Sequence, residues 1–331
     1  LFLKGKAIYE KQCLFCHGAA GGGDGKAAYL LYPKPRDFTR GEFRLVSTND
    51  MSVRDMDLFK TITRGMPGSA MPPWEFLDEK DRWALVYYVR YLAELGQKKA
   101  DGEITDEKIR QGLSWEEKKE LATERIDPEA VIKIGEEPEV TQEGITRGRN
   151  LFVKGCASCH GLHGKGDGQQ MMMDSLGLPL KPRDLTAGIF KASGSSEELY
   201  YRMMAGLPGS PMPSYQYAFK PEEIWDLIHY VQTLPEAGAE ERARLRRHQI
   251  SVKRVKDSLS ADPAADFWKK ADPVFVVLTP LWWRNERMEG VEVRALHDGN
   301  QIAILLSWKD VTQNNLTVAP QSFSDGAALQ F

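Results

Sequence analysis

The chain has 331 residues, of which 42% are hydrophobic and 27% are charged, and its formal net charge is −3. This length can hold two or three domains with separate cores. The nearly balanced charge gives no bulk attraction to nucleic acid or anionic lipid, so we expect no nucleic-acid partner. Because no apolar run reaches the roughly 18 residues that span a bilayer, we expect no transmembrane segment. The numbering opens on Leu1 rather than Met, and we expect that an export signal precedes it.

The sequence repeats itself at an offset of about 143 residues. Residues 5–18 (GKAIYEKQCLFCHG) match residues 148–161 (GRNLFVKGCASCHG). Three later segments also match: Gly-Asp-Gly at 23–25 and 166–168, Lys-Pro-Arg-Asp at 34–37 and 181–184, and the segments 65–72 (GMPGSAMP) and 206–213 (GLPGSPMP). Apolar residues at helical spacing, near 82–92 and 224–234, close each unit. The repeat predicts two equivalent helical lobes.

Each unit contains one Cys-x-x-Cys-His motif, formed by Cys13, Cys16 and His17 in the first and by Cys156, Cys159 and His160 in the second. This spacing lets two thiols bond the two vinyl groups of one haem while the adjacent His ligates the iron. A zinc knuckle or a redox-active cysteine pair uses the same spacing. Zinc would need four ligands, whereas each unit offers two Cys and one His. The sequence therefore predicts two haem c groups.

The repeat also selects a second axial ligand. Among the methionines only Met71 and Met212 are equivalent, since Met66 aligns with Leu207. His/Met ligation fills both axial positions and raises the potential, which predicts electron transfer and not an enzyme. A di-haem peroxidase, which needs one open iron position, is the alternative, and a binding or assembly module with structural haems is a third class.

Several other polar residues recur or stand out. Arg36 and Arg183 occupy matched Lys-Pro-Arg-Asp segments, where each could pair with a haem propionate or form a structural Arg-Asp turn. His163 follows His160 in a Gly-rich loop and is expected to be solvated. His229 lies on the last helix of the second unit, and we expect it to be a packed or hydrogen-bonded residue.

The pattern divides the chain into five parts. They are a lobe at 1–96, a charged linker at 97–143 that could dock a short helix, a second lobe at 144–235, a charged helical linker at 236–261 and a β-rich region at 262–331. Within the last part we expect strands at 274–279, 291–296 and 301–308, with a hairpin turn at 297–300 (His-Asp-Gly-Asn). This region would leave an open sheet edge, so we expect it to be incomplete at Phe331.

Both lobes, at 1–95 and 144–235, resemble class I cytochromes c, which are small all-α domains in which a Met-Pro loop covers the haem. The resemblance implies a mainly α chain located in the periplasm or another extracytoplasmic compartment. The tail, in segments 295–299, 307–310 and 325–331, resembles the opening of the haem-b-binding domain of ethylbenzene dehydrogenase gamma subunits. That family implies a partial β-sandwich that conducts electrons for molybdenum enzymes with iron-sulfur subunits, including nitrite and nitrate oxidoreductases. It implies a haem b only if the natural chain continues past Phe331.

Overall fold

The computed structural model describes residues 1–31, 33–174, 177, 179–239, 250–256, 258–277 and 290–308. Its contacts divide the chain into two units, Leu1–Glu240 and Glu241–Phe331. The α-helices of the described residues lie in the first unit and a small mixed sheet lies in the second, so the predicted mainly α fold is confirmed. None of the described helices combines the length and apolar character needed to cross a bilayer.

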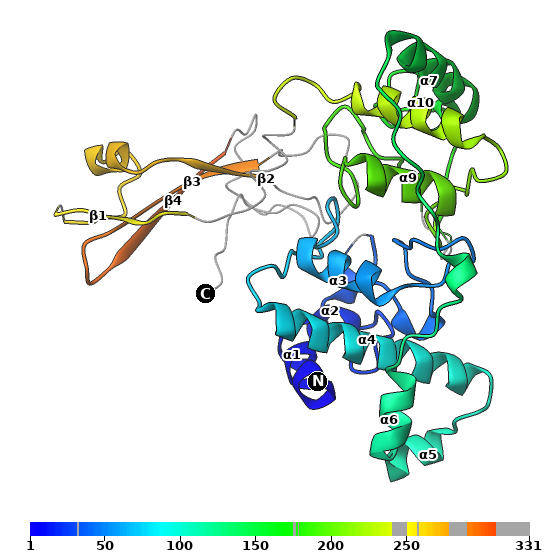
Figure 1. Ribbon diagram of the computed structural model, residues 1–331. Helices are drawn as coiled ribbons and strands as arrows, with labels where there is room; N and C mark the ends of the chain where they lie inside the picture. Colours follow the sequence, from blue (N-terminus) through cyan, green and yellow to red (C-terminus); the bar gives the residue numbers. More distant parts are fainter. Residues whose placement is uncertain are drawn as a thin grey trace. The chain divides into compact units, whose positions relative to one another are not determined.

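The first lobe is built on two long helices that cross. Its elements are α1 (Phe2–Gln12), α2 (Leu14–His17), α3 (Asp55–Arg64) and α4 (Glu79–Ala100), with 3-10 turns at Ala28–Leu30 and Phe38–Arg40. Helix α1 packs across α4 (Figure 1). Gly5 lies at the crossing, where a Cβ atom would overlap the backbone carbonyl of Ala84. The matched glycine of the repeat is therefore a point of close helix approach.

The second lobe repeats this arrangement. Its elements are α7 (Gln142–Gly155), α8 (Ala157–His160), α9 (Ser196–Ala205) and α10 (Pro221–Gln232). Helix α7 crosses α10, and Gly148 lies against the carbonyl of Asp226 as Gly5 lies against that of Ala84. Side chains at the two crossings, such as Tyr9 and Phe152, are almost completely buried.

The charged segment between the lobes packs on the first lobe. It contains α5 (Asp106–Gln111), α6 (Trp115–Leu121) and a 3-10 turn at Pro128–Ala130. Leu121 is buried, and the ring of Trp115 meets that of Phe2 edge-on at 5.9 Å between centroids. Farther on, the amide of Ile132 donates to the carbonyl of Ser47 at 3.0 Å. The expected docking of a short helix is thus observed, and α4 extends through Ala100, beyond the predicted lobe limit.

The two lobes also contact each other directly. Glu198 on α9 is buried and forms ion pairs with Lys60 and Arg64 on α3, at 3.2 and 3.3 Å. Arg202, also on α9, donates to the carbonyl of Val46 in the first lobe. Helices α3 and α9 are equivalent in the repeat, so matching elements of the two lobes meet.

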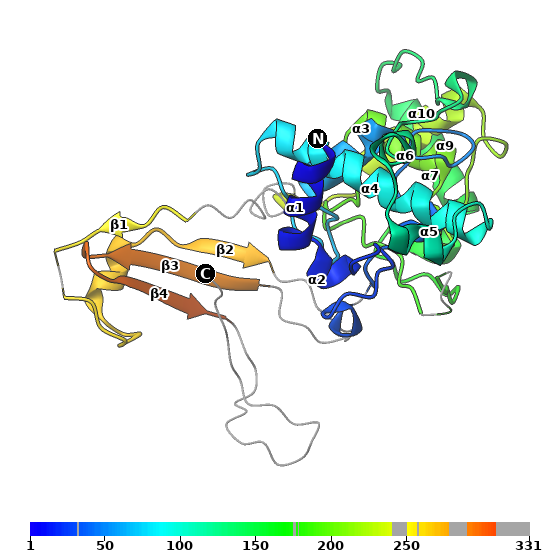
Figure 2. The ribbon, with the colours of Figure 1, turned by 90° about the horizontal axis from the view of Figure 1, so that it is seen from below.

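The second unit contains a four-stranded mixed sheet (Figure 2). Strand β3 (Gly290–His297) pairs with β1 (Lys253–Arg254) and β2 (Val274–Val277) along one edge and with β4 (Ile302–Ser307) along the other. The β3–β4 hairpin confirms the predicted turn, because the Asp298 side chain accepts from the amides of Asn300 and Gln301 at 2.7 and 2.8 Å. A 3-10 helix at Asp266–Lys270 supplies Phe267 and Trp268 to a small core.

The described part of the region from 236 to 331 differs in one place from the structure expected from the sequence. The prediction of a helix at 236–261 is wrong at Lys253–Arg254, because these two residues form strand β1. The next residue, Val255, is buried in the tail core, and its amide donates to the carbonyl of His297. Tertiary packing has overridden helix propensity there. The described strands form one sheet, and the β-sandwich stays a prediction. Residues 309–331, which carry part of the resemblance, and residues 240–249 lie outside the described part.

Candidate functional site

A sharp turn at each Cys-x-x-Cys-His motif gathers its three functional side chains. Helix α1 ends before Cys13, whose amide donates to the carbonyl of Tyr9, and the amide of His17 then donates to the carbonyl of Cys13 at 2.9 Å. The second motif has the same pattern, with Cys156 bonded to the carbonyl of Phe152 and His160 bonded to that of Cys156. In both lobes a short helix therefore places the cysteines and the His on one turn.

Each motif histidine is oriented by a backbone carbonyl. Nδ1 of His17 lies 3.0 Å from the carbonyl oxygen of Arg36, and Nδ1 of His160 lies 3.2 Å from that of Arg183. Such a bond fixes the ring and leaves Nε2 as the atom available to a metal. Burial lowers the pKa of both histidines, which favours the neutral imidazole that binds metal.

The methionine loops also have the same geometry in both lobes. In the first, the amide of Met66 donates to the carbonyl of Met71 at 3.1 Å, and the Ser69 hydroxyl accepts from the amide of Met71 at 3.3 Å. In the second lobe the corresponding bonds join Leu207 to Met212 at 3.1 Å and Met212 to Ser210 at 3.4 Å. The repeat therefore holds Met71 and Met212 in equivalent turns.

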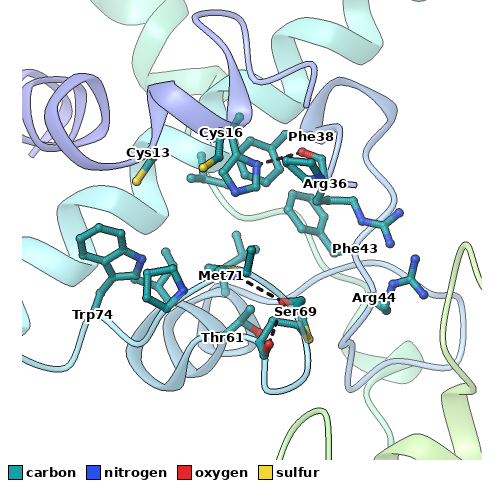
Figure 3. Close-up of a pocket in the computed structure, with 18 of the residues that line it drawn as sticks. Cys13, Cys16, Arg36, Phe38, Phe43, Arg44, Thr61, Ser69, Met71 and Trp74 are labelled. Carbon is teal, nitrogen blue, oxygen red and sulfur yellow. Dashed lines mark hydrogen bonds between the residues drawn. The ribbon is translucent and has the colours of Figure 1, made fainter. Parts of the chain in front are cut away.

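A pocket in the first lobe brings the predicted residues together. Cys13 and Cys16 lie along one side, and Met71 and Ser69 lie along the other (Figure 3). His17 also lines the pocket, and so does Met66, the other methionine considered as an iron ligand in this lobe. The remaining walls are mainly apolar and include Leu31, Pro33, Phe38, Phe43, Leu45, Leu58, Ile62, Leu85 and Val89. An apolar pocket with two free thiols, an oriented imidazole and a thioether fits a covalently attached haem.

The environment of the cysteines disfavours the two other chemistries that this spacing allows. Burial raises the pKa of the Cys13 thiol to about 12 and that of Cys156 to about 11. Redox-active cysteine pairs instead have lowered pKa values. Within the described residues, no group of three or more His, Cys, Asp or Glu side chains is arranged to hold a metal ion such as zinc.

The matched Arg36 and Arg183 contribute to the site through their backbone as well as their side chains. Their carbonyls bind the histidines, and the following Asp37 and Asp184 accept from the amides of Thr39 and Thr186 at 3.0 and 2.9 Å. The side chain of Arg36 lines the first pocket, at the same edge as Arg44 (Figure 3). In the first lobe this segment therefore forms a turn and also places the Arg36 side chain at the pocket, and the pairing of Arg36 with a haem propionate stays a prediction.

The side chain of Arg183 instead donates to the carbonyl of Pro67 in the other lobe at 2.8 Å. The sequence reasoning also missed Lys191, which lines the first pocket from the second lobe. Its position eight residues after Arg183 matches that of Arg44 after Arg36, and this was the available signal. His229 forms the expected hydrogen bond, with Glu137 at 3.1 Å.

Comparison with known proteins agrees with this geometry. Residues 145–235 match the family described as cytochrome c, and residues 2–89 match the family described as cytochrome c oxidase, cbb3-type, subunit III. A solved chain of the Kuenenia stuttgartiensis reducing HAO-like protein complex Kustc0457/Kustc0458 is 32% identical, with a TM-score of 0.59, over 70% of this chain and 96% of that chain. The chain belongs to the cytochrome c family. No curated protein matches it.

As a tandem cytochrome c, the chain is a haem c electron-transfer protein with one family region in each lobe. The two regions cover the two crossed-helix lobes, and the pocket of this tandem cytochrome is lined by residues of the first region together with Lys191 of the second. The linker helices and the tail sheet lie outside both family regions.

Proposed function

We propose that this tandem cytochrome c carries electrons through two haems with His/Met ligation, as a non-catalytic subunit of a larger extracytoplasmic oxidoreductase complex. The proposed attachment residues are Cys13 and Cys16 in the first lobe and Cys156 and Cys159 in the second; the proposed axial pairs are His17 with Met71 and His160 with Met212. The equivalent hydrogen bonding of the two methionine loops is the observation that carries the proposal.

The residues of each lobe have separable tasks. A bound haem would supply a one-electron iron couple. The thiols would hold it in place, the carbonyls of Arg36 and Arg183 orient the two imidazoles that would bind its iron, and the thioethers of Met71 and Met212 would supply the second iron ligand, which would leave no site for a substrate. Apolar walls lower the local dielectric and exclude water, which helps to set the potential.

The partner complex is proposed on two grounds. The similar solved chain comes from a protein complex, named as HAO-like. The tail resemblance points to a molybdenum enzyme with an iron-sulfur subunit, of the nitrite or nitrate oxidoreductase type, and to a haem b only if the natural chain continues past Phe331. Covalent haem attachment supports a periplasmic or other extracytoplasmic location.

Absorption spectroscopy of matched variants tests the ligation. Wild-type protein should contain two c-type haems by pyridine haemochrome analysis and show the Met-to-iron charge-transfer band. Met71→His and Met212→His should each remove about half of that band and lower one potential, because imidazole replaces the thioether that favours ferrous iron.

Met66→Leu is the control and should retain the whole band. A full band in Met71→His, together with the loss of about half of the band in Met66→Leu, would contradict the assignment. A five-coordinate high-spin haem in the wild type would instead favour the di-haem peroxidase alternative.

A further inference from the structure

Cations from both lobes gather beside the first-lobe pocket. Arg36, Arg44 and Lys191 all line it, although Lys191 belongs to the second lobe. Burial, followed by the charges of Arg183, Arg44 and Arg36, lowers the pKa of Lys191 to about 7. All four side chains are thus close enough to interact. The repeat relates them as two pairs, Arg36 with Arg183 and Arg44 with Lys191.

The cations of each lobe reach the methionine loop of the other lobe. Arg183 donates to the carbonyl of Pro67 at 2.8 Å, four residues before Met71, and a Cβ atom on Gly68 would overlap its guanidinium. In return, Arg44 donates to the carbonyl of Gly209 at 3.4 Å, three residues before Met212. The contacts are reciprocal, like those of a two-fold interface between identical subunits.

Among the residues that the structure describes, Lys191 has no anionic partner of its own. Within the described part of the chain, its half-buried amine forms no hydrogen bond or ion pair, while Glu42 and Asp174 act on Arg36. Placing an ammonium beside three guanidinium groups is unfavourable unless carboxylates compensate it. A haem carries two propionates, and propionates are carboxylates of this kind.

We propose that Arg36, Arg44 and Lys191, which line the pocket from both lobes, form one carboxylate site, in which Lys191 of the second lobe binds a propionate of the haem held by the first. This inference rests on the proposed haem content. It implies that the first haem site is incomplete without the second lobe and that its potential depends on a residue outside its own family region. A nearby positive charge favours the reduced haem, so Lys191 raises that potential.

The test is a potentiometric titration of the full chain with Lys191→Met. We expect the reduction equilibrium of the first-lobe haem to shift about tenfold toward the oxidised form, or about 59 mV for one electron. The second-lobe haem should shift much less. The first-lobe step is identified as the one that moves when Met71→His removes its share of the charge-transfer band. Lys191→Arg keeps the charge and should retain a potential near that of the wild type.

Lys133→Met is the matched control, because this substitution removes the same charge from an exposed site in the linker. Intact mass reports the haem content and the charge-transfer band reports the ligation. Failure of the proposed function can therefore be distinguished from failure of the inference about Lys191. If Lys191→Met does not fold, Lys191→Gln is titrated in its place. A shift no larger than that of Lys133→Met, or an equal shift of both haems, overturns the proposal.

Discussion

Glu198 shows at the scale of a single residue how the two lobes are held together. Its side chain on α9 is 8% exposed and lies between Lys60 and Arg64 of α3. Burial opposes ionisation, but the charges of Arg64, Lys60 and Arg202 outweigh it, so the pKa of Glu198 is lowered. A carboxyl with a lowered pKa stabilises the folded state above its unfolded pKa of about 4.5, and this stabilisation is lost as the pH falls through the folded pKa.

We therefore expect Glu198→Gln to reduce the free energy of unfolding by about 2 kcal/mol at pH 7, because the partly buried cations Lys60 and Arg64 lose the carboxylate between them. The deficit should shrink below pH 4, where the wild type loses the same interaction. Denaturant unfolding at the two pH values measures it. Glu197→Gln is the control, since Glu197 pairs with the same Lys60 but is 54% exposed, and it should change stability by less than about 0.5 kcal/mol. A deficit independent of pH would contradict the argument.

The residues of the site differ in how much of their environment is local in sequence. The Cys, His and Met positions followed from a local motif and its repeat, and the structure brings the first-lobe set to one pocket. The contacts of Glu198 and Lys191 could not be predicted, because they depend on how one lobe packs on the other. A repeat predicts equivalent residues but carries no information about which of them meet.

At the scale of elements, the helix crossing defines each lobe. Gly5 and Gly148 let α1 and α7 approach the carbonyls of Ala84 and Asp226 more closely than any side chain allows. Helical periodicity predicted the closing helices, since apolar stripes are local in sequence. It missed the strand at Lys253–Arg254, whose conformation comes from pairing with a segment about 40 residues away. The boundaries predicted between the five parts of the chain, at residues 96, 143, 235 and 261, stay predictions.

Gly5→Val and Gly148→Val should each reduce the free energy of unfolding by about 3 kcal/mol, because the added atoms force the crossing helices apart. Denaturant unfolding followed by the haem absorption of each lobe measures the effect. Gly135→Val is the matched control: a Cβ at Gly135 meets no atom within 4 Å, and we expect a change below about 0.5 kcal/mol. Equal effects at Gly135 and Gly5 would show that loss of glycine itself, and not the crossing, is responsible.

At the scale of the whole molecule, two separate cores indicate two folding units. The core of the first unit contains residues from both lobes, including Leu85 and Phe152. The core of the second contains Val255, Phe267, Trp268 and Leu296 and shares no residue with it. Units with separate cores can fold independently. The haem chemistry should then depend on the first unit alone.

A chain that ends at Ala239 should therefore keep both c-type haems, the full Met-to-iron band and both potentials of the intact protein. In the full chain, Trp268→Ala should destabilise only the second unit, by about 3 kcal/mol, because it empties the centre of the small core. Thermal unfolding followed by haem absorption should be unchanged in this variant, while the tail transition, followed by near-ultraviolet circular dichroism, moves to lower temperature. Loss of a haem from the shortened chain, or a haem transition that moves with Trp268→Ala, would show that the two units depend on each other for stability.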